Sequence, residues 1–218
     1  MTVIGNNMNQ LTQHFFDAPD SVFTHADVAA ALKGSDDHRY GLVKRALAKG
    51  EIQSIRRGLY CLARRYQKKP VSVYALSQRI YGPSYVSLES ALSYHGWIPE
   101  AVYGCTCASY GKAKNFDTPL GLFSYQRIPQ EVFYTGVERL VDSNGNVSLM
   151  ATPAKALADY VYVHRPTWST IEGASGSLRI EMEDLLAVNA EDVTELAENY
   201  RNSRVARFIA HWREVLKA

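Results

Sequence analysis

The chain has 218 residues, 46% of them hydrophobic and 21% charged, and a formal net charge of +2. This composition is that of a chain with a buried core and excludes an intrinsically disordered protein, and the length allows one large domain or two modest ones. No apolar run approaches the roughly 18 residues of a membrane span, and the N-terminus lacks the pattern of a signal peptide. We therefore expect a soluble, cytoplasmic protein without a membrane partner.

The three cysteines, Cys61, Cys105 and Cys107, fit a reducing compartment, because their number and spacing match neither a disulfide framework nor a zinc site. In a strand over 102–110, Cys105 and Cys107 point to the same face, where we expect them to be small buried apolar residues. No metal and no cofactor are expected.

Short helices and turn signals alternate along the first seventy residues. A helix over 9–16 is followed by a turn and by a short strand at Val22-Phe23. Thr24 is the expected N-cap of a helix over 25–32, with Asp27 at its third position.

A second helix is predicted over 35–49, with Ser35 or Asp36 as its cap. Two short helices joined by three to four residues that include a glycine, here Gly34, are typical of a helix-turn-helix.

The two sides of this second helix differ in character when residues are placed at about 100° intervals. The side assigned to the core carries Tyr40, Leu42, Val43, Ala46 and Leu47. The other side carries Asp37, His38, Gly41, Lys44, Arg45 and Ala48. Two cations beside small residues allow close approach to a phosphate backbone or a groove floor. Arg39 falls on the inward side, where we expect an ion pair within the protein and only a weaker DNA contact.

Basic residues gather in and after this helix. Residues 39–69 hold ten Lys or Arg and a single acid, Glu51, which gives +9 against +2 for the whole chain. Segregation of charge this strong favours a polyanionic partner for one end of the molecule.

Apolar residues at 52, 55, 59 and 62 predict a two-stranded hairpin with Arg56-Arg57-Gly58 as its basic turn. Such a wing commonly lies along phosphates or reaches into the minor groove. The alternative is a solvated hairpin whose arginines aid solubility. The next segment, from Arg64 and Arg65 to Pro70, is interpreted as a linker whose cations either add phosphate contacts or keep the junction solvated.

The composition changes beyond residue 70. Residues 1–70 hold eleven basic and six acidic residues, for +5, and residues 71–218 hold thirteen and sixteen, for −3. We therefore predict a DNA-binding domain over 1–70 and a C-terminal domain over 71–218. The expected fold class is α+β, with an N-terminal winged helix-turn-helix followed by a mixed α/β domain that ends in helices.

The second domain is predicted to mix helices and strands. Ser87 is the expected N-cap of a helix over 87–95, Asn144-Gly145 an expected two-residue hairpin turn, and Thr152-Pro153 the expected start of a helix. The remaining predictions are a helix over 72–81 and strands over 102–110, 120–128, 132–141 and 147–150.

The C-terminal third is predicted to be helical. Residues 172–198 hold eight acids and one base, Arg179. This pattern indicates either a solvated face or a surface for a basic partner or for the DNA-binding domain. The final helix carries an apolar stripe that we assign to the core, although a dimer or partner surface has the same pattern. The stripe is Val205, Phe208, Ile209, Trp212 and Leu216.

No pattern of catalytic residues is found. The sequence has no Gly-rich phosphate loop, nucleophile elbow or H-E-x-x-H motif, and its six histidines are scattered. The acids at 181, 183 and 184 spread around a helix instead of forming the metal site of a nuclease. We therefore expect a protein that is not an enzyme.

Three segments resemble the AbiEi antitoxin family. They are Ile55-Arg56-Arg57-Gly58-Leu59-Tyr60 in the predicted wing, residues 83–100 (PSYVSLESALSYHGWIPE) and residues 152–159 (TPAKALAD). The first segment alone carries little specificity, whereas the second and third in this order are much more specific. The resemblance runs from about residue 24 to 163, and the final fifty residues match no segment of the family.

The resemblance implies a winged helix-turn-helix followed by an antitoxin domain. Such antitoxins repress their own operon by binding inverted repeats in its promoter. They also counteract a cognate nucleotidyltransferase toxin, in a type IV arrangement in which a stable complex need not form. The implied partners are double-stranded DNA and that toxin, and whether the chain binds DNA as a monomer or a homodimer stays open. The apolar spacing within 87–100 and 152–159 suggests scaffold.

These patterns together predict a DNA-binding transcriptional regulator and antitoxin. The start of the second helix, with Lys44 and Arg45, is expected to enter the major groove, while Arg56 and Arg57 hold the backbone or the minor groove. One alternative is a protein-interaction module that inhibits its partner by direct contact, and another is a nucleic-acid-processing enzyme. The residues predicted to contact DNA are Ser35, His38, Arg39, Gly41, Lys44, Arg45, Ser54, Arg56, Arg57, Arg64 and Arg65.

Overall fold

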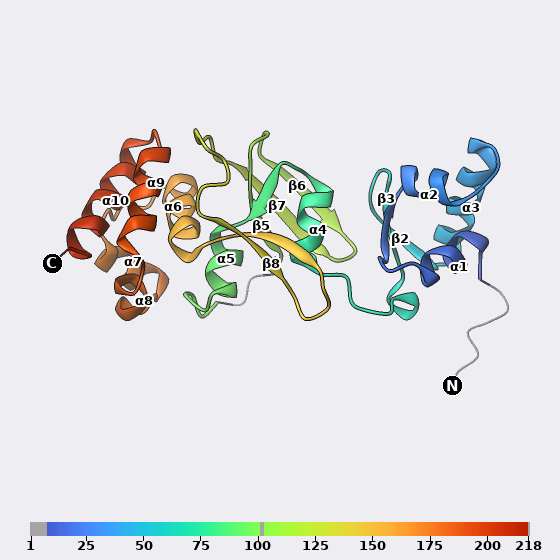
Figure 1. Ribbon diagram of the computed structural model, residues 1–218, viewed down its shortest axis with the longest axis horizontal. Helices are drawn as coiled ribbons and strands as arrows, with labels where there is room; N and C mark the ends of the chain where they lie inside the picture. Colours follow the sequence, from blue (N-terminus) through green and yellow to red (C-terminus); the bar gives the residue numbers. More distant parts are fainter. Residues whose placement is uncertain (1–7, 101–102, 218) are drawn as a thin grey trace. The chain divides into compact units, whose positions relative to one another are not determined.

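The computed structural model describes residues 8–100 and 103–217, and it confirms the predicted α+β class (Figure 1). The chain divides into two compact units. The first unit holds the described residues up to Ser72, and the second runs from Val73 onward, apart from residues 118–120, which group with the first.

The first unit combines three α-helices with a small antiparallel sheet of strand order β1-β3-β2. Its helices begin at polar caps, such as Asn9, whose side chain accepts from the backbone N–H of Leu11 at 3.0 Å. In chain order the elements are α1 (Gln10–Asp17), β1 (Val22–Thr24), α2 (His25–Ala31), α3 (Asp36–Ala48), β2 (Ile52–Arg56), β3 (Leu59–Leu62) and a 3₁₀ turn, η1 (Arg64–Tyr66).

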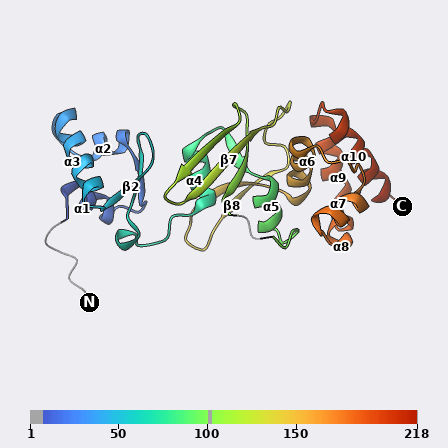
Figure 2. The same ribbon diagram turned by 180° about the vertical axis from the view of Figure 1, so that it is seen from behind.

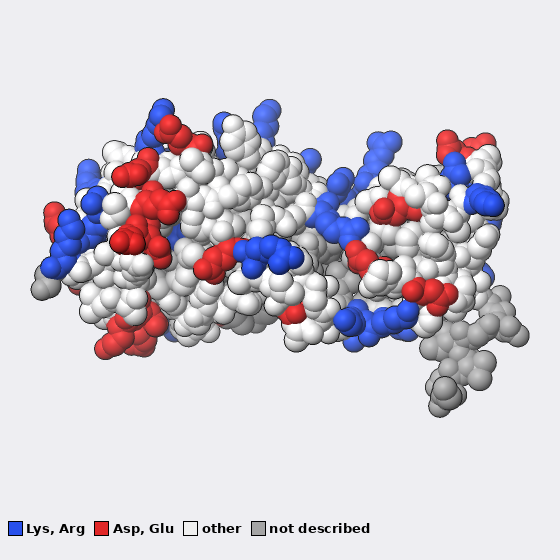
Figure 3. Space-filling view, in the orientation of Figure 1, with Lys and Arg blue, Asp and Glu red and all other residues white. Residues whose placement is uncertain are grey.

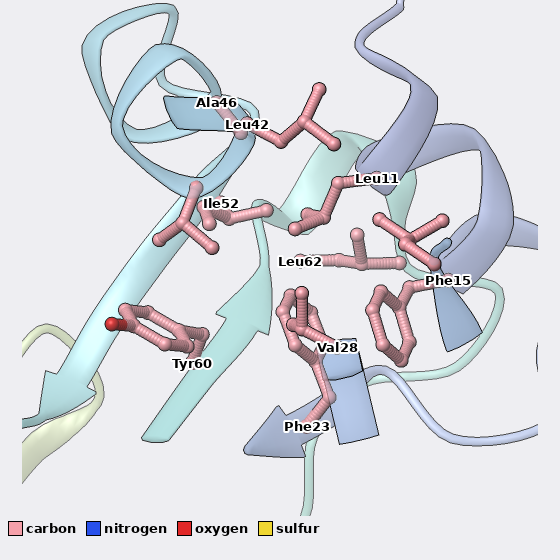
Figure 4. Packing of buried hydrophobic residues seen from close by; sticks show 11 residues of the cluster. Leu11, Phe15, Phe23, Val28, Leu42, Ala46, Ile52, Tyr60 and Leu62 are labelled. Atoms are coloured by element: carbon pink, nitrogen blue, oxygen red, sulfur yellow. The ribbon is translucent and has the colours of Figure 1, made fainter. Parts of the chain in front are cut away.

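One apolar cluster holds the first unit together, and Figure 4 shows how its side chains converge from the helices onto the sheet. The rings of Phe15 and Phe23 stack with centroids 3.8 Å apart, and Leu11 and Ala46 are completely buried. Burial of each large side chain stabilises the fold by about 2 kcal/mol. The short helices of this unit therefore depend on their packing against the sheet.

The second unit is built on a six-stranded mixed sheet of order β6-β7-β5-β4-β9-β8. Strand β4 pairs antiparallel with β5 and parallel with β9, while β5 pairs parallel with β7. Its strands are β4 (Ser84–Val86), β5 (Cys105–Ser109), β6 (Lys114–Thr118), β7 (Gly121–Arg127), β8 (Val137–Val141) and β9 (Val147–Ala151). Its helices are α4 (Val73–Ile80), α5 (Leu88–Tyr94), α6 (Pro153–His164), α7 (Ile171–Leu178), α8 (Met182–Leu186), α9 (Ala190–Asn199) and α10 (Ser203–Val215).

The C-terminal helices α7 to α10 gather beside α6 at one end of this unit (Figure 2). The apolar stripe of α10 lies in the core, as predicted, since Val205, Phe208, Ile209 and Trp212 are all 0% exposed. Leu216 is only partly buried because it caps the end of the helix. The stripe is therefore already covered within its own unit.

Several strand predictions need correction. The strand predicted over 132–141 begins only at Val137, because the side chain of Asn199 binds both the N–H and the carbonyl of Val132, at 2.6 and 2.7 Å. Strand β6 was not predicted, since most of its side chains are exposed and carry no apolar alternation. The predicted strand over 102–110 begins at Cys105, and its first residue, Val102, lies outside the described residues.

The hairpin turn at Asn144-Gly145 is also longer than predicted. Val141 pairs with Val147, so the connection spans residues 142–146. The carboxylate of Asp142 accepts from the backbone N–H groups of Asn144 and Asn146 at 2.8 and 2.9 Å. The side chain of Asp142 therefore organises this longer loop by binding the backbone that follows it. A two-residue turn needs no such side-chain contact.

Two predictions at helix starts had different outcomes. Thr152 caps α6 by accepting from the N–H of Lys155 at 3.3 Å, with Pro153 as the first helical residue, as predicted. Ser87 makes no side-chain cap on α5, because its hydroxyl donates instead to buried Asp159 at 2.6 Å. Cys105 and Cys107 are buried on one face of β5, also as predicted.

Within the described residues, no helix has both the length and the apolar character that crossing a membrane requires.

Candidate nucleic-acid interface

Side-chain caps fix the start of both α2 and α3. Thr24 and Asp27 form a capping box, with distances of 3.2 Å from the Asp27 N–H to the Thr24 hydroxyl and 2.6 Å from the Thr24 N–H to the Asp27 carboxylate. Ser35 accepts from the N–H of His38 at 3.3 Å and caps α3. Gly34, between the helices, has φ +121°, and a Cβ there would lie 2.9 Å from the His38 ring. Both caps confirm the prediction, and the turn requires glycine.

The inward face of α3 is narrower than predicted. Leu42, Val43 and Ala46 are buried, but Tyr40 is 64% exposed and Leu47 is 36% exposed, which corrects their assignment to the core. At 100° per residue, Tyr40 and Leu47 lie on the flank of the helix beyond Val43, outside its buried face. A large aromatic ring therefore belongs to the outer surface of α3.

Arg39 is held inside the unit, as predicted. Its guanidinium donates to Asp36 at 2.6 Å and to the carbonyls of Gly34 and Leu32 at 2.5 and 3.3 Å. The side chain is 20% exposed. Arg39 thus binds the carbonyls that follow α2, as basic residues at helix ends commonly do, and its role here is structural.

The outward cations of α3 lie in its second half. Lys44 and Arg45 are exposed, and a Cβ on Gly41 would lie 3.3 Å from the Arg45 guanidinium, so this arginine folds back over the glycine. The first turn is acidic, with exposed Asp36 and Asp37 that suit the positive end of the helix dipole. Positive charge is therefore presented from the middle of α3 onward, and the helix start carries two exposed acids.

The β2–β3 hairpin turns at the two residues Arg57 and Gly58, since Arg56 pairs with Leu59. Gly58 has φ +78°, which suits the tight connection. A bulge lies between Ser54 and Arg56, and the Ser54 hydroxyl lies 3.4 Å from the Arg56 carbonyl. Arg56 and Arg57 are both exposed at the tip. The hairpin thus presents two consecutive arginines outward.

The segment predicted as a linker is ordered at its start. Arg64, Arg65 and Tyr66 form η1, and the Arg65 guanidinium donates to the carbonyls of Gly50 and Lys49 at 2.8 and 3.3 Å. It also lies 4.8 Å from the centroid of the Tyr66 ring. Arg65 therefore binds the C-terminal end of α3, a role that neither alternative for the linker included. Both Arg64 and Arg65 are exposed.

Glu51, the one acid within the basic segment 39–69, is buried. Its carboxylate accepts from the Thr12 hydroxyl at 2.6 Å and the Asn9 N–H at 3.1 Å, and lies 3.9 Å from Lys49 Nζ. Asn9 in turn donates to the carbonyl of Leu42 at 2.8 Å. Glu51 thus connects α1 to the end of α3 through hydrogen bonds. Because its carboxylate is buried, it neutralises little of the positive charge on the surface of the first unit.

The surface charge is mixed when one face of the molecule is viewed as a whole. Figure 3 shows Lys and Arg side chains over the first unit with acidic groups interspersed among them, and both acidic and basic groups over the C-terminal helices of the second unit. The two exposed pairs, Lys44 with Arg45 and Arg56 with Arg57, come from α3 and from the β2–β3 hairpin, which follow one another in the chain. They are the candidate interface.

The second unit contains a polar cluster that sequence reasoning missed. The buried cluster consists of Tyr85, Ser87, Lys155, Asp159 and Tyr200, all at most 4% exposed. Lys155 Nζ lies 2.8 Å from Asp159 Oδ1 and 2.6 Å from the Tyr200 hydroxyl, and Tyr85 donates to Asp159 Oδ2 at 3.0 Å. The sequence signal was a lysine and an aspartate four residues apart inside the otherwise apolar segment 152–159.

Burial dominates the electrostatics of this cluster. It lowers the pKa of Lys155 although Asp159 acts in the opposite direction. It also raises the pKa of Tyr85 and of Tyr200, and the negative charge of Asp159 adds to both shifts. Because the cluster is completely enclosed, we interpret it as a structural hydrogen-bond network.

Neither the cysteines nor the acids come together as a metal site. Among the residues that the structure describes, no three His, Cys, Asp or Glu side chains lie close enough to hold an ion. The sulfur atoms of Cys105 and Cys107 are 3.6 Å apart within the core.

In comparisons with known proteins, no family model matches this chain and no curated protein is similar to it in sequence.

Proposed function

We propose that the chain is a sequence-specific DNA-binding regulator whose first unit is a winged helix-turn-helix. The order α1-β1-α2-α3-β2-β3, with a sheet of order β1-β3-β2 and a two-residue basic turn, supports this proposal most strongly. The order is that of a helix-turn-helix followed by a hairpin wing, and the exposed cations lie on the two elements that such a domain lays against DNA.

In this proposal α3 lies in the major groove, with Lys44 and Arg45 binding the phosphates that border it. Arg56 and Arg57, at the tip of the hairpin, hold the backbone or the minor groove of the same duplex. Arg39 and Arg65 are left out of the interface, because their hydrogen bonds to backbone carbonyls give both a structural role.

We also propose that the regulator is an antitoxin that represses its own operon at inverted repeats and counteracts a nucleotidyltransferase toxin. The resemblance of residues 55–60, 83–100 and 152–159 to the AbiEi family supports this part. The antitoxin role then belongs to the second unit. Its two resembling segments contribute Ser87, Lys155 and Asp159 to the buried cluster, so we propose that they maintain the fold of that unit.

A second candidate function is inhibition of a partner protein by direct contact. Tyr110, Val132 and Tyr134 are 61%, 60% and 45% exposed on the second unit, and the ring of Phe133 packs against both tyrosines. Exposed aromatic groups of this kind commonly mark protein-binding surfaces.

Two measurements separate these functions. Fluorescence anisotropy with the duplex upstream of the chain's own reading frame, against a scrambled duplex of equal length, is expected to show a preference of about a thousandfold or more at physiological salt. Equal affinities would contradict a sequence-specific regulator. Gel filtration with the nucleotidyltransferase encoded by a neighbouring reading frame tests the second candidate, since co-elution without promoter binding favours direct contact.

A further inference from the structure

Tyr40 is 64% exposed on the outer flank of α3, and Tyr60 of β3 lies buried near it. Tyr60 is only 7% exposed, and its hydroxyl lies 2.9 Å from Nε2 of His25, at the start of α2. Burial raises the pKa of Tyr60, and nearby Tyr40 raises it further. Figure 4 shows the Tyr60 ring with its hydroxyl pointing away from the other labelled side chains. Tyr40 therefore projects outward, while the nearby Tyr60 is part of the core.

The residues that follow Tyr40 on α3 favour a polyanion as its contact, while Asp36 and Asp37 are exposed one turn before it and Asp36 is paired with Arg39. Lys44 is exposed one turn further along α3, at the spacing that places two side chains on one face. Gly41, the next residue, has no side chain that could shield the ring, and Leu47 adds a second exposed apolar group two turns away. A cation beside an apolar ring suits the edge of a DNA groove, where phosphates border the bases.

Resting on the proposed function, we propose that Tyr40 is a specificity-determining residue whose ring packs against the 5-methyl group of a thymine in the major groove. Thymine is the base that presents an apolar group on this edge, and side-chain contact with that methyl group is one of the ways in which a helix reads sequence. Apart from Leu47, which is 36% exposed, the remaining outward residues of α3 are polar or small, so Tyr40 supplies the largest exposed apolar group of this helix.

The test removes the methyl groups and leaves the rest of the duplex unchanged. The full chain is titrated onto the duplex from its own promoter and onto the same duplex with every thymine replaced by deoxyuridine, which pairs identically and carries the same charge. The wild-type chain is expected to bind the thymine duplex about fourfold more tightly for each methyl group contacted. Tyr40→Ala is expected to weaken binding to the thymine duplex and to bind both duplexes equally.

Two further variants serve as controls. Lys44→Ala is expected to weaken binding to both duplexes by the same factor, so the thymine preference survives. Tyr40→Phe keeps the ring and is expected to keep the preference, whereas its loss in this variant would assign the contact to the hydroxyl and overturn the proposal.

The remaining outcomes separate this inference from the proposed function. Wild-type binding to the promoter with no thymine preference, or a preference that persists in Tyr40→Ala, overturns the role of Tyr40 alone. Wild-type binding no tighter than to the scrambled duplex overturns the proposed function, and the role of Tyr40 with it.

Discussion

Lys155 and Asp159 form an ion pair at 2.8 Å in which both side chains are 0% exposed. An isolated buried charge costs several kcal/mol, so such a pair persists only when other hydrogen bonds complete it. Asp159 also accepts from Ser87, Tyr85 and Tyr200, and from Gln130 at 3.2 Å. The carboxylate thus joins β4, the loop after β7, α6 and the segment before α10.

Breaking this pair from one side should destabilise the second unit strongly. Asp159→Asn or Lys155→Met is expected to lower the free energy of unfolding by about 3–5 kcal/mol, because each leaves a buried charge without its partner. Urea titrations followed by tryptophan fluorescence measure this, since Trp97, Trp168 and Trp212 all lie in the second unit.

The double variant tests whether the two residues act together. Lys155→Met with Asp159→Leu should cost clearly less than the sum of the single losses, because no unpaired charge is left. The exposed pair of Arg201 and Glu131, at 2.7 Å, is the matched control, and its removal should cost less than about 1 kcal/mol. Strictly additive losses at 155 and 159 would show that the pair is not coupled.

The hairpin arginines should control the salt dependence of DNA binding. Replacing Arg56 and Arg57 with alanine is expected to weaken binding to all sequences and to reduce the slope of log K against log salt by about one to two. Arg179→Ala with Arg201→Ala removes the same charge from exposed positions of the second unit and should leave the slope unchanged. An unchanged slope in the hairpin variant would remove the hairpin from the interface.

Arg39 and Lys44 should behave as opposites although both are cations of α3. Arg39→Ala is expected to lower the free energy of unfolding by about 1 kcal/mol, because the Arg39 guanidinium binds Asp36 and backbone carbonyls. Hydrogen exchange at the α2–α3 turn should then be faster, while the slope of log K against log salt should change little. Lys44→Ala is expected to leave exchange unchanged and to reduce the slope by about one. The reverse pattern would contradict the structural role of Arg39.

The first unit should lose stability at alkaline pH through Cys61. Burial raises the pKa of this thiol from 9.0 to about 11. The stability linked to the protonated thiol is therefore fully present below pH 9.0, the unfolded value, and is lost as the pH rises through about 11. In Cys61→Ala, urea titrations followed by circular dichroism should show a shallower loss of stability across this interval. Equal slopes in both proteins would contradict the assignment.

Local chemistry made the starts and turns of the first unit predictable. Thr24, together with Asp27, caps α2, and Ser35 caps α3. Each cap acts as predicted because its effect depends on residues only two or three positions away. The inward ion pair of Arg39 is likewise a contact between neighbours on one helix. Such features need no knowledge of the rest of the fold.

Contacts between distant segments explain the misses. Val132 leaves the predicted strand because Asn199, 67 residues away, binds its backbone. Ser87 fails as a cap because Asp159, 72 residues away, takes its hydroxyl. Tyr40 is exposed beyond the edge of the buried face of α3, and helical periodicity alone does not set how far neighbouring elements cover that face.

The sequence by itself therefore determined the α+β class, the caps and the concentration of charge in residues 39–69, because these follow from composition and from interactions within a few residues. Only the tertiary structure decided which members of that basic segment face outward. Glu51 and Arg39 bind groups inside the first unit, and Arg65, although exposed, binds backbone carbonyls at the end of α3, while Lys44, Arg45, Arg56 and Arg57 extend from the surface. The physical reason is that a charged side chain is stable inside the protein only where backbone carbonyls or opposite charges form hydrogen bonds or ion pairs with it. Only folding brings those partners within reach.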